Sequence, residues 1–403
     1  MNFITTGLNA TLEVFANEMM DLWLPGLTID NVVYRIALVN GIFDGKGYEQ
    51  VTKTRGSCSL EGCNACDFPG FKFGKGPTGS VVYPFYSRYL LSNDSRRLKR
   101  PLRVKYASNM YNISTEINNP PIEKTYKNYI DAGKLFESNI DRKILHINGV
   151  KGIWAFHILP YASLIVKTKD RMHTSDHVIN DALKVLCKSK DSHSNRTEKA
   201  AVRSACQANK IFPFLYTPDE NGKPKNIPWF LNKNTYELHD IKLRCVIGAK
   251  SVEVPKKILK RKKGRTTAES IMYGVNGWAS WCLHSEEVEE FTGYVDNKLK
   301  LFDVLRILNS NKINLTDVNS IRMLTIDALV EHSALFPPCE QTYALHELIH
   351  VVEQIPKIGP AKFNTLFAFE RVNATLKRMI KNRCNSMPSI VKAYAVSFKS
   401  YMH

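Results

Sequence analysis

The 403-residue chain is 44% hydrophobic, so it can bury a core in two or three domains, or in one domain with a large insertion, and disorder is not expected. Its 56 Lys and Arg against 38 Asp and Glu give a formal net charge of +18, which favours a polyanion such as DNA or RNA over an acidic small molecule; an ordinary basic protein is the alternative. No segment carries the roughly 18 consecutive apolar residues of a membrane span, and the N-terminus lacks a secretion signal, so we expect an intracellular protein without a membrane anchor.

The first two predicted elements are a helix and a buried strand. Apolar residues at helical spacing predict a helix over residues 7–24, which Pro25 and Gly26 end. The stretch "NVVYRIALVNGIFD", from Asn31 to Asp44, is dense in Val, Ile and Tyr and predicts a β-strand buried along nearly its whole length. Asp44 ends this strand beside flexible glycines and is a candidate site residue, although an exposed turn aspartate gives the same pattern.

Residues 57–80 are rich in Gly and Cys and predict a loop held by a metal ion. Nine cysteines in a reducing compartment favour metal ligation over disulfides. Cys63 and Cys66 offer two thiolate ligands on a tight turn, which is half of a tetrahedral zinc site. A Cys-x2-Cys pair without a metal is the alternative. A short strand-like piece over residues 80–91 follows the loop.

From about residue 116 to residue 335 the pattern is mostly helical, with polar interruptions. One interruption is the basic run at residues 256–265. This run indicates either a solvated linker or, equally, a nucleic-acid contact or a nuclear import signal. The candidate nucleic-acid-binding residues in it are Lys260, Arg261, Lys262 and Lys263.

The end of the chain is predicted to form two helices. The first carries Tyr343–Ile355, and the residues from Pro356 to Pro360 are expected to break it. The second is predicted over residues 364–383.

The first of these helices contains an HExxH motif. His346 and His350 lie four residues apart on one helical face and can hold one zinc ion. In a zinc peptidase Glu347 would be the general base and Glu370 the third ligand. This interpretation does not explain the basic composition or the cysteines, and the sequence around Glu370 lacks the Asn-Glu pair usual in such peptidases.

The same histidines fit a second kind of site. Together Cys63, Cys66, His346 and His350 make a Cys2His2 donor set, which is closed and tetrahedral and therefore structural. It would tie a loop near the start of the chain to a helix near its end. An unligated cysteine pair with a core histidine pair is the alternative.

The order of these motifs resembles the catalytic core of the CACTA (En/Spm-type) DNA transposases, and the catalytic subunit of the V(D)J recombinase has a related layout. Cys63 follows Asp44 by nineteen residues, and Glu370 follows His350 by twenty. The stretches "VVYRIALVNGIFDGKG", "SCSLEGCNACDF", "VVYPFYSRYLLSNDSRR" and "KGRTTAESIMYGVNGWASWCLHS" are similar to segments of that family. Relatives often lack a glutamate at the position of Glu347, so we expect this residue to be incidental.

The resemblance implies an α/β fold. Its parts are a partial RNase H-like core at residues 1–115, a large, mainly helical insertion at residues 116–335, and C-terminal helices at residues 336–403 that complete the core. The insertion carries the family's Asp-x2-His signature, here Asp170 and His173, whose role is uncertain in the family.

In this family two aspartates and a glutamate hold two Mg²⁺ ions, which act on the scissile phosphodiester of DNA during cut-and-paste transposition. By motif, Asp44 is the second acid and Glu370 the third. Asn373, Lys377 and Lys381 follow Glu370 at helical spacing and are candidate phosphate contacts, with a solvated helix face as the alternative.

The first aspartate of the family has no counterpart, because Asp21 and Asp30 lie too close to Asp44. We therefore expect the initial strands to be missing and strand cleavage to be impaired. The alternatives are a domesticated DNA-binding or protein-interaction protein without catalysis, a decayed element and a gene model that begins too late. The expected partner is DNA, the expected cofactors are structural Zn and, if the chain is active, catalytic Mg, and the expected location is the nucleus. Homo-oligomerisation is left open.

Overall fold

The computed structural model describes residues 3–38, 41–43, 45–73, 80–83, 86–97, 102–106, 109–113, 120–141, 143–165, 170–186, 239, 242, 274–275, 278–283, 292–336, 340–363 and 366. The chain forms two compact units, residues 1–364 and residues 365–403, and nearly all described residues belong to the first. The division into residues 1–115, 116–335 and 336–403 stays a prediction.

Among the described helices, none is both long enough and apolar enough to cross a membrane.

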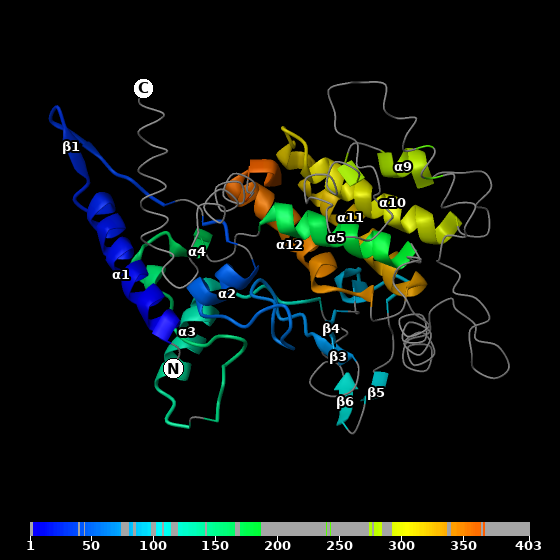
Figure 1. Cartoon of the computed structure of the whole chain (residues 1–403), viewed down its shortest axis with the longest axis horizontal. Helices are drawn as coiled ribbons and strands as arrows, with labels where there is room; N and C mark the ends of the chain where they lie inside the picture. Colours follow the sequence, from blue (N-terminus) through cyan, green and yellow to red (C-terminus); the bar gives the residue numbers. More distant parts are fainter. Residues whose placement is uncertain are drawn as a thin grey trace, which may run out of the picture. The chain divides into compact units, whose positions relative to one another are not determined.

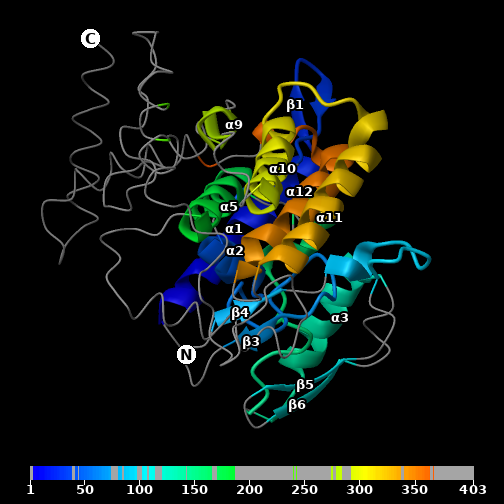
Figure 2. The same cartoon turned by 90° about the vertical axis from the view of Figure 1, so that its right-hand side faces the viewer.

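Four helices of the first unit pack side by side: α5 (Arg171–Leu186), α10 (Thr292–Leu308), α11 (Val318–Leu335) and α12 (Tyr343–Ile358). Helix α11 contacts both α10 and α12, and α5 contacts α12 and α10 (Figures 1 and 2). Buried aliphatic side chains fill the space between them, among them Leu301, Leu329 and Leu348. This bundle supplies the rigid support for α12.

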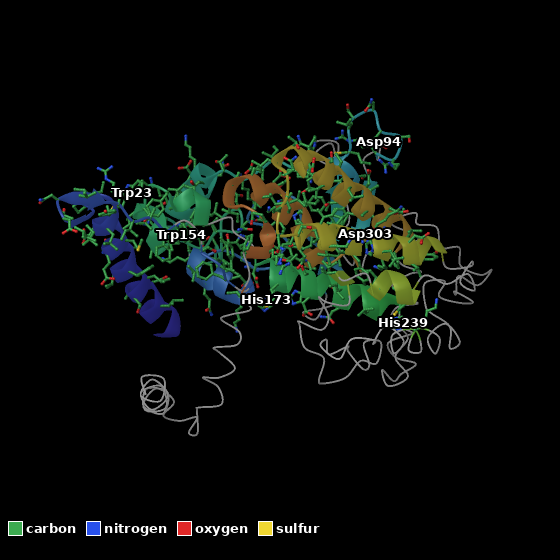
Figure 3. All side chains as sticks on the ribbon, turned by 90° about the horizontal axis from the view of Figure 1, so that it is seen from above. Trp23, Asp94, Trp154, His173, His239 and Asp303 are labelled. Atoms are coloured by element: carbon green, nitrogen blue, oxygen red, sulfur yellow. The ribbon has the colours of Figure 1, made fainter. Side chains whose placement is uncertain are left out.

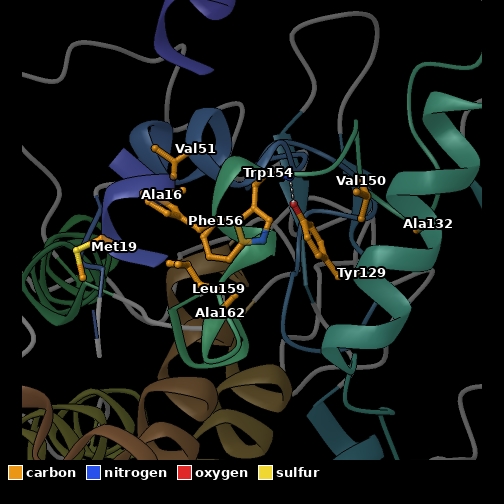
Figure 4. Packing of buried hydrophobic residues seen from close by; sticks show 10 residues of the cluster. All are labelled: Ala16, Met19, Val51, Tyr129, Ala132, Val150, Trp154, Phe156, Leu159 and Ala162. Carbon is orange, nitrogen blue, oxygen red and sulfur yellow. Dashed lines mark hydrogen bonds between the residues drawn. The ribbon is translucent and has the colours of Figure 1, made fainter. Parts of the chain in front are cut away.

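A second apolar cluster joins α1 (Phe3–Trp23), α2 (Gly45–Thr52), α3 (Tyr126–Glu137) and the 3-10 turn η3 (Ala155–Ile158). Trp154 is its centre and is fully buried, with Phe156 at 5.4 Å between ring centroids (Figure 4). The backbone N–H of Trp154 donates to the Tyr129 hydroxyl at 3.2 Å, and that hydroxyl donates to the carbonyl of Thr52 at 2.6 Å. These two bonds satisfy the buried Tyr129 hydroxyl and the Trp154 N–H, and they fix α3 against α2.

The described strands form three antiparallel pairs of two strands each. They are β1 (Leu27–Ile29) with β2 (Val32–Tyr34), β3 (Phe71–Phe73) with β4 (Ser80–Val82), and β5 (Leu102–Tyr106) with β6 (Asn109–Ile113). The remaining short elements are η1 (Tyr86–Tyr89), α4 (Ala162–Ile165), α9 (Trp278–Leu283), η5 (Leu315–Asp317) and η7 (Ala361–Phe363). The described chain is thus mostly helical with small antiparallel sheets, which is compatible with the α/β class.

The prediction of a helix over residues 7–24 is confirmed, because α1 covers residues 3–23. The prediction of a long buried strand from Asn31 is wrong. Among the described residues of this stretch, which leave out 39, 40 and 44, only Val32–Tyr34 form a strand, and their side chains are exposed, Val33 by 55%. Asp30 and Asn31 both have positive φ, as in a type I′ turn, so the chain folds back on β1 as a hairpin. An apolar run is buried only where another layer covers it, and within the described part no third strand extends this pair.

The predicted break between Pro356 and Pro360 is confirmed, since α12 ends at Ile358, although Pro356 itself lies inside the helix. A proline in the last turn removes one backbone donor without ending the helix. Gly359 ends it instead, because its φ of 81° is left-handed and its N–H donates to the carbonyl of Ile355 at 2.9 Å.

Candidate metal centre

Cys63 and Cys66 lie in a loop that other parts of the chain hold in place. The Gly70 N–H donates to the Leu60 carbonyl at 2.7 Å and closes the loop on itself. The Lys124 ammonium donates to the carbonyl of Cys63 at 2.7 Å. These hydrogen bonds to backbone carbonyls fix the path of the loop. The loop therefore orients both thiols without the help of a bound metal.

Gly62 makes the turn before Cys63 sterically feasible. A Cβ atom at this position would lie 2.3 Å from the carbonyl oxygen of Gly56, closer than real Cβ contacts come. The loop can therefore close at this point only with glycine.

His346 and His350 are placed by α12. They lie four residues apart, so both side chains leave the helix on one face, and both are buried. Their neighbours Leu345, Leu348 and Ile349 are buried as well, which anchors the helix in the bundle. The HExxH segment is thus part of the core on nearly all sides.

The four side chains meet at one point, although about 280 residues separate the cysteines from the histidines. Their ligand atoms all lie within 4.8 Å of one another. Cys63 Sγ lies 3.3 Å from His350 Nε2, and Cys66 Sγ lies 3.4 Å from His346 Nε2. The two sulfurs are 3.6 Å apart and the two Nε2 atoms 3.2 Å apart. This buried Cys2His2 cluster could hold one metal ion such as zinc.

Aromatic rings cover the His346 side of the cluster. The Phe68 ring stacks on the imidazole at 4.7 Å between centroids, and the Tyr83 ring at 5.3 Å with an interplanar angle of 8°. Both rings are buried. This packing fixes the plane of the imidazole and keeps the donors in a low-dielectric environment, where charge interactions are strong.

The donor groups polarise one another. Burial raises the pKa of the Cys63 thiol. Its hydrogen bond with Cys66 and the charges of His350 and His346 lower the pKa by more, so the net pKa lies well below the usual value. Burial and the neighbouring Cys63 raise the pKa of Cys66. Burial lowers the pKa of His350, whereas Cys63 and Glu353 raise it, to about 9. The cluster therefore favours a thiolate, the form of cysteine that binds metals.

Glu347 makes a contact with helix α5. Its Oε2 atom accepts a hydrogen bond from Thr174 Oγ1 at 3.0 Å. Its charge contributes to the raised pKa of the Tyr343 hydroxyl, for which burial is the larger cause.

The Asp-x2-His signature begins α5. Asp170 is buried and accepts hydrogen bonds from the backbone N–H groups of Met172, at 3.1 Å, and His173, at 3.3 Å. It also pairs with the His173 imidazole, which lies near the start of α5 (Figure 3). Asp170 therefore acts as the N-cap of this helix, and Thr174 links the same turn to Glu347. In the structure the signature orders the helix that supports α12.

The other predicted site residues lie outside the described part of the chain. These are Asp44, Glu370, Asn373, Lys377, Lys381, Lys260, Arg261, Lys262 and Lys263. Their predicted roles stay predictions.

Sequence reasoning missed the residues that surround the donors. His350 Nδ1 lies 2.9 Å from Glu353 Oε2, and Arg322 Nε donates to Glu353 Oε1 at 3.0 Å. The spacing of three residues between His350 and Glu353 on one helix is a signal that could have pointed to the first contact. Arg322 comes from α11, and no local pattern indicates it.

Comparison with known proteins finds no matching family model, no matching curated protein and no matching solved structure.

Proposed function

We propose that Cys63, Cys66, His346 and His350 bind one structural Zn²⁺ ion, in a DNA-binding protein of transposase descent. The observation that carries the zinc proposal is the convergence of four buried donors from two distant segments. The transposase part rests on the sequence resemblance and on the net charge of +18.

The spacing of the donors supports zinc. Tetrahedral sites with Zn–S bonds of about 2.3 Å and Zn–N bonds of about 2.0–2.1 Å have edges of about 3.8 Å between sulfurs, about 3.3–3.4 Å between nitrogens and about 3.5–3.6 Å between sulfur and nitrogen. The corresponding separations here are 3.6 Å, 3.2 Å and 3.3–3.4 Å. These four separations are within a few tenths of an ångström of the tetrahedral values, and the other two sulfur–nitrogen pairs lie within 4.8 Å.

The same donor set argues against the peptidase. Catalytic zinc keeps one position for water or substrate, whereas two thiolates and two imidazoles complete a tetrahedron. In addition, Glu347, the base in that mechanism, is engaged by Thr174. A structural role follows from the chemistry of the donors.

The proposed partner is DNA, bound through its phosphates. By the resemblance, Asp44 and Glu370 would hold catalytic Mg²⁺. A domesticated DNA-binding or protein-interaction role fits the same residues.

The zinc proposal is tested by metal content. The full chain should contain one zinc per molecule, and both Cys63→Ser and His346→Ala should lose it. Cys58→Ser, an exposed cysteine of the same loop, is the matched control and should keep it. If Cys63→Ser retains zinc and His346→Ala loses it, a histidine site without cysteines replaces the one proposed.

The DNA proposal is tested by salt dependence. Phosphate contacts release counterions, so the logarithm of the binding constant should fall linearly with the logarithm of salt concentration. An affinity for duplex DNA that does not change between 50 and 200 mM salt, roughly the range over which such contacts are expected to weaken strongly, would exclude a phosphate-based interface.

A further inference from the structure

We infer that Glu353 and Arg322 are positioning residues of the metal site, which connect its histidine half and its cysteine half through α11. This inference rests on the proposed zinc site and adds to it two residues that bind no metal themselves.

The first part of this connection is the contact between His350 and Glu353. His350 presents Nε2 to the cluster, which leaves Nδ1 on the opposite side of the ring, 2.9 Å from Glu353 Oε2. A ligating histidine commonly donates its second N–H to a carboxylate, which fixes the tautomer and the ring orientation and makes the ligand more basic. With Nδ1 protonated, Nε2 carries the lone pair that a metal needs.

Arg322 holds the carboxylate in that position. Its Nε donates to Glu353 Oε1 at 3.0 Å, so each carboxylate oxygen has its own partner. Because Arg322 belongs to α11 and Glu353 to α12, the pair also fastens the two helices to each other.

The second part of this connection runs from Arg322 to the cysteines. The Arg322 guanidinium lies over the ring of Tyr89, 5.8 Å from its centroid. The Tyr89 hydroxyl lies 3.7 Å from Cys66 Sγ. A cation over an aromatic face is attracted to it, so Arg322 restrains the ring whose hydroxyl contacts the ligand sulfur. Arg322 therefore contacts Glu353 on the histidine side of the site and Tyr89 on the cysteine side.

The test is the zinc affinity of full-length variants, measured by competition with a chromophoric chelator. Glu353→Ala should bind zinc about 10- to 100-fold more weakly than the wild type, the usual loss for such an outer residue. Arg322→Ala should weaken binding in the same direction but less, since His350 keeps its carboxylate. The effects of the two substitutions should not add in the double variant, because both act through one contact.

Glu331→Ala is the matched control. Glu331 lies on α11, its side chain is as exposed as that of Glu353, and it pairs with Lys300 at 2.8 Å. Its removal breaks a comparable ion pair away from the cluster and should leave zinc affinity unchanged. Glu353→Gln keeps the shape of the side chain and an oxygen acceptor, so it should fold and should bind zinc with an affinity between those of the wild type and Glu353→Ala.

A spectroscopic measurement separates positioning from general stability. With Co²⁺ in place of zinc, Glu353→Ala should shift the visible ligand-field bands, and Glu331→Ala should not. Glu353→Ala with wild-type affinity and spectrum, or Glu331→Ala as weak as Glu353→Ala, would overturn the inference while the zinc site stands. A wild-type chain that binds neither zinc nor Co²⁺ would overturn the zinc site itself.

Discussion

Cys63 Sγ and His350 Nε2 lie 3.3 Å apart although 287 positions separate the two residues in the chain. The loop around Cys63 is held by its own backbone hydrogen bonds, and His350 is held by the packing of α12 in the helical bundle. A metal ion bound by both residues would link the Cys63 loop, which hydrogen bonds order, to the helical bundle, which side-chain packing orders. The contribution of the metal to stability should therefore be large.

Removal of the metal should destabilise the chain. Metal binding to a structural site is coupled to folding, so a chelator should lower the thermal midpoint of the wild type by roughly 5–10 °C. Cys63→Ser should already melt at the lower temperature, and the chelator should not change it further. Cys58→Ser should behave like the wild type, and differential scanning calorimetry with and without EDTA measures all three.

Gly62→Ala should weaken the metal site. The added Cβ would lie 2.3 Å from the Gly56 carbonyl oxygen, so the loop must move. Overpacking of this kind costs about 1–3 kcal/mol, which corresponds to zinc affinity roughly 5- to 150-fold lower. Gly45→Ala is the control, because a Cβ at that position meets no atom within 4 Å. Equal zinc affinities for the two variants, measured by chelator competition, would contradict the expected clash.

Lys298 should make the stability of the chain depend on pH. It is buried between helices, with Nζ 3.2 Å from His332 Nδ1 and 3.9 Å from the centroid of the Phe336 ring. Burial lowers its pKa from 10.5 to about 7, partly opposed by Glu340 and Asp181. Above pH 7 the unfolded chain binds more protons at this residue than the folded chain does. The free energy of unfolding should therefore rise between pH 7 and pH 9.

Chemical denaturation at several pH values in this range measures the effect. The Lys298 contribution to the slope is at most about 1.4 kcal/mol per pH unit, and Lys298→Met should remove it. Lys300→Met, which changes an exposed lysine on the same helix, should keep the slope of the wild type. A wild-type slope that persists in Lys298→Met would assign the dependence to other groups.

Trp154→Ala should destabilise the cluster between α1, α2 and α3. The indole is fully buried, and replacement of such a side chain by alanine leaves a cavity and costs about 3–5 kcal/mol. Val14→Ala, at a position that is 60% exposed on α1, should change stability by less than about 0.5 kcal/mol. Urea denaturation followed by far-UV circular dichroism compares the two, and similar midpoints would mean that the cluster contributes little to the fold.

The sequence predicted the helices and the donor residues because both follow from local patterns. The spacing of apolar residues indicated α1, and the spacing of Cys63, Cys66, His346 and His350 indicated ligands on one turn and on one helical face. That these two pairs meet was inferred from their chemistry, since each is half of a tetrahedral set.

Other features depend on neighbours that no local pattern specifies. The residues after Asn31 are apolar enough for a buried strand, yet a two-residue turn pairs them with β1 and leaves them exposed. Arg322 contacts Glu353, the partner of His350, only because α11 lies beside α12. The prolines at 356 and 360 indicated where α12 ends, whereas the positive φ of Gly359, the residue that ends it, is set by the folded backbone.

The separation of the two ligand pairs also governs when the site can form during synthesis. A ribosome adds about 5–20 residues per second, so roughly 15–60 s pass between the addition of Cys63 and that of His350. Throughout this interval Cys63 and Cys66 lack His346 and His350 as partners, so their thiols are open to alkylation, oxidation or capture by cellular metal chaperones. Closure of the centre is thus a late event in biogenesis, and thiol labelling of stalled nascent chains should find Cys63 reactive until α12 has left the exit tunnel.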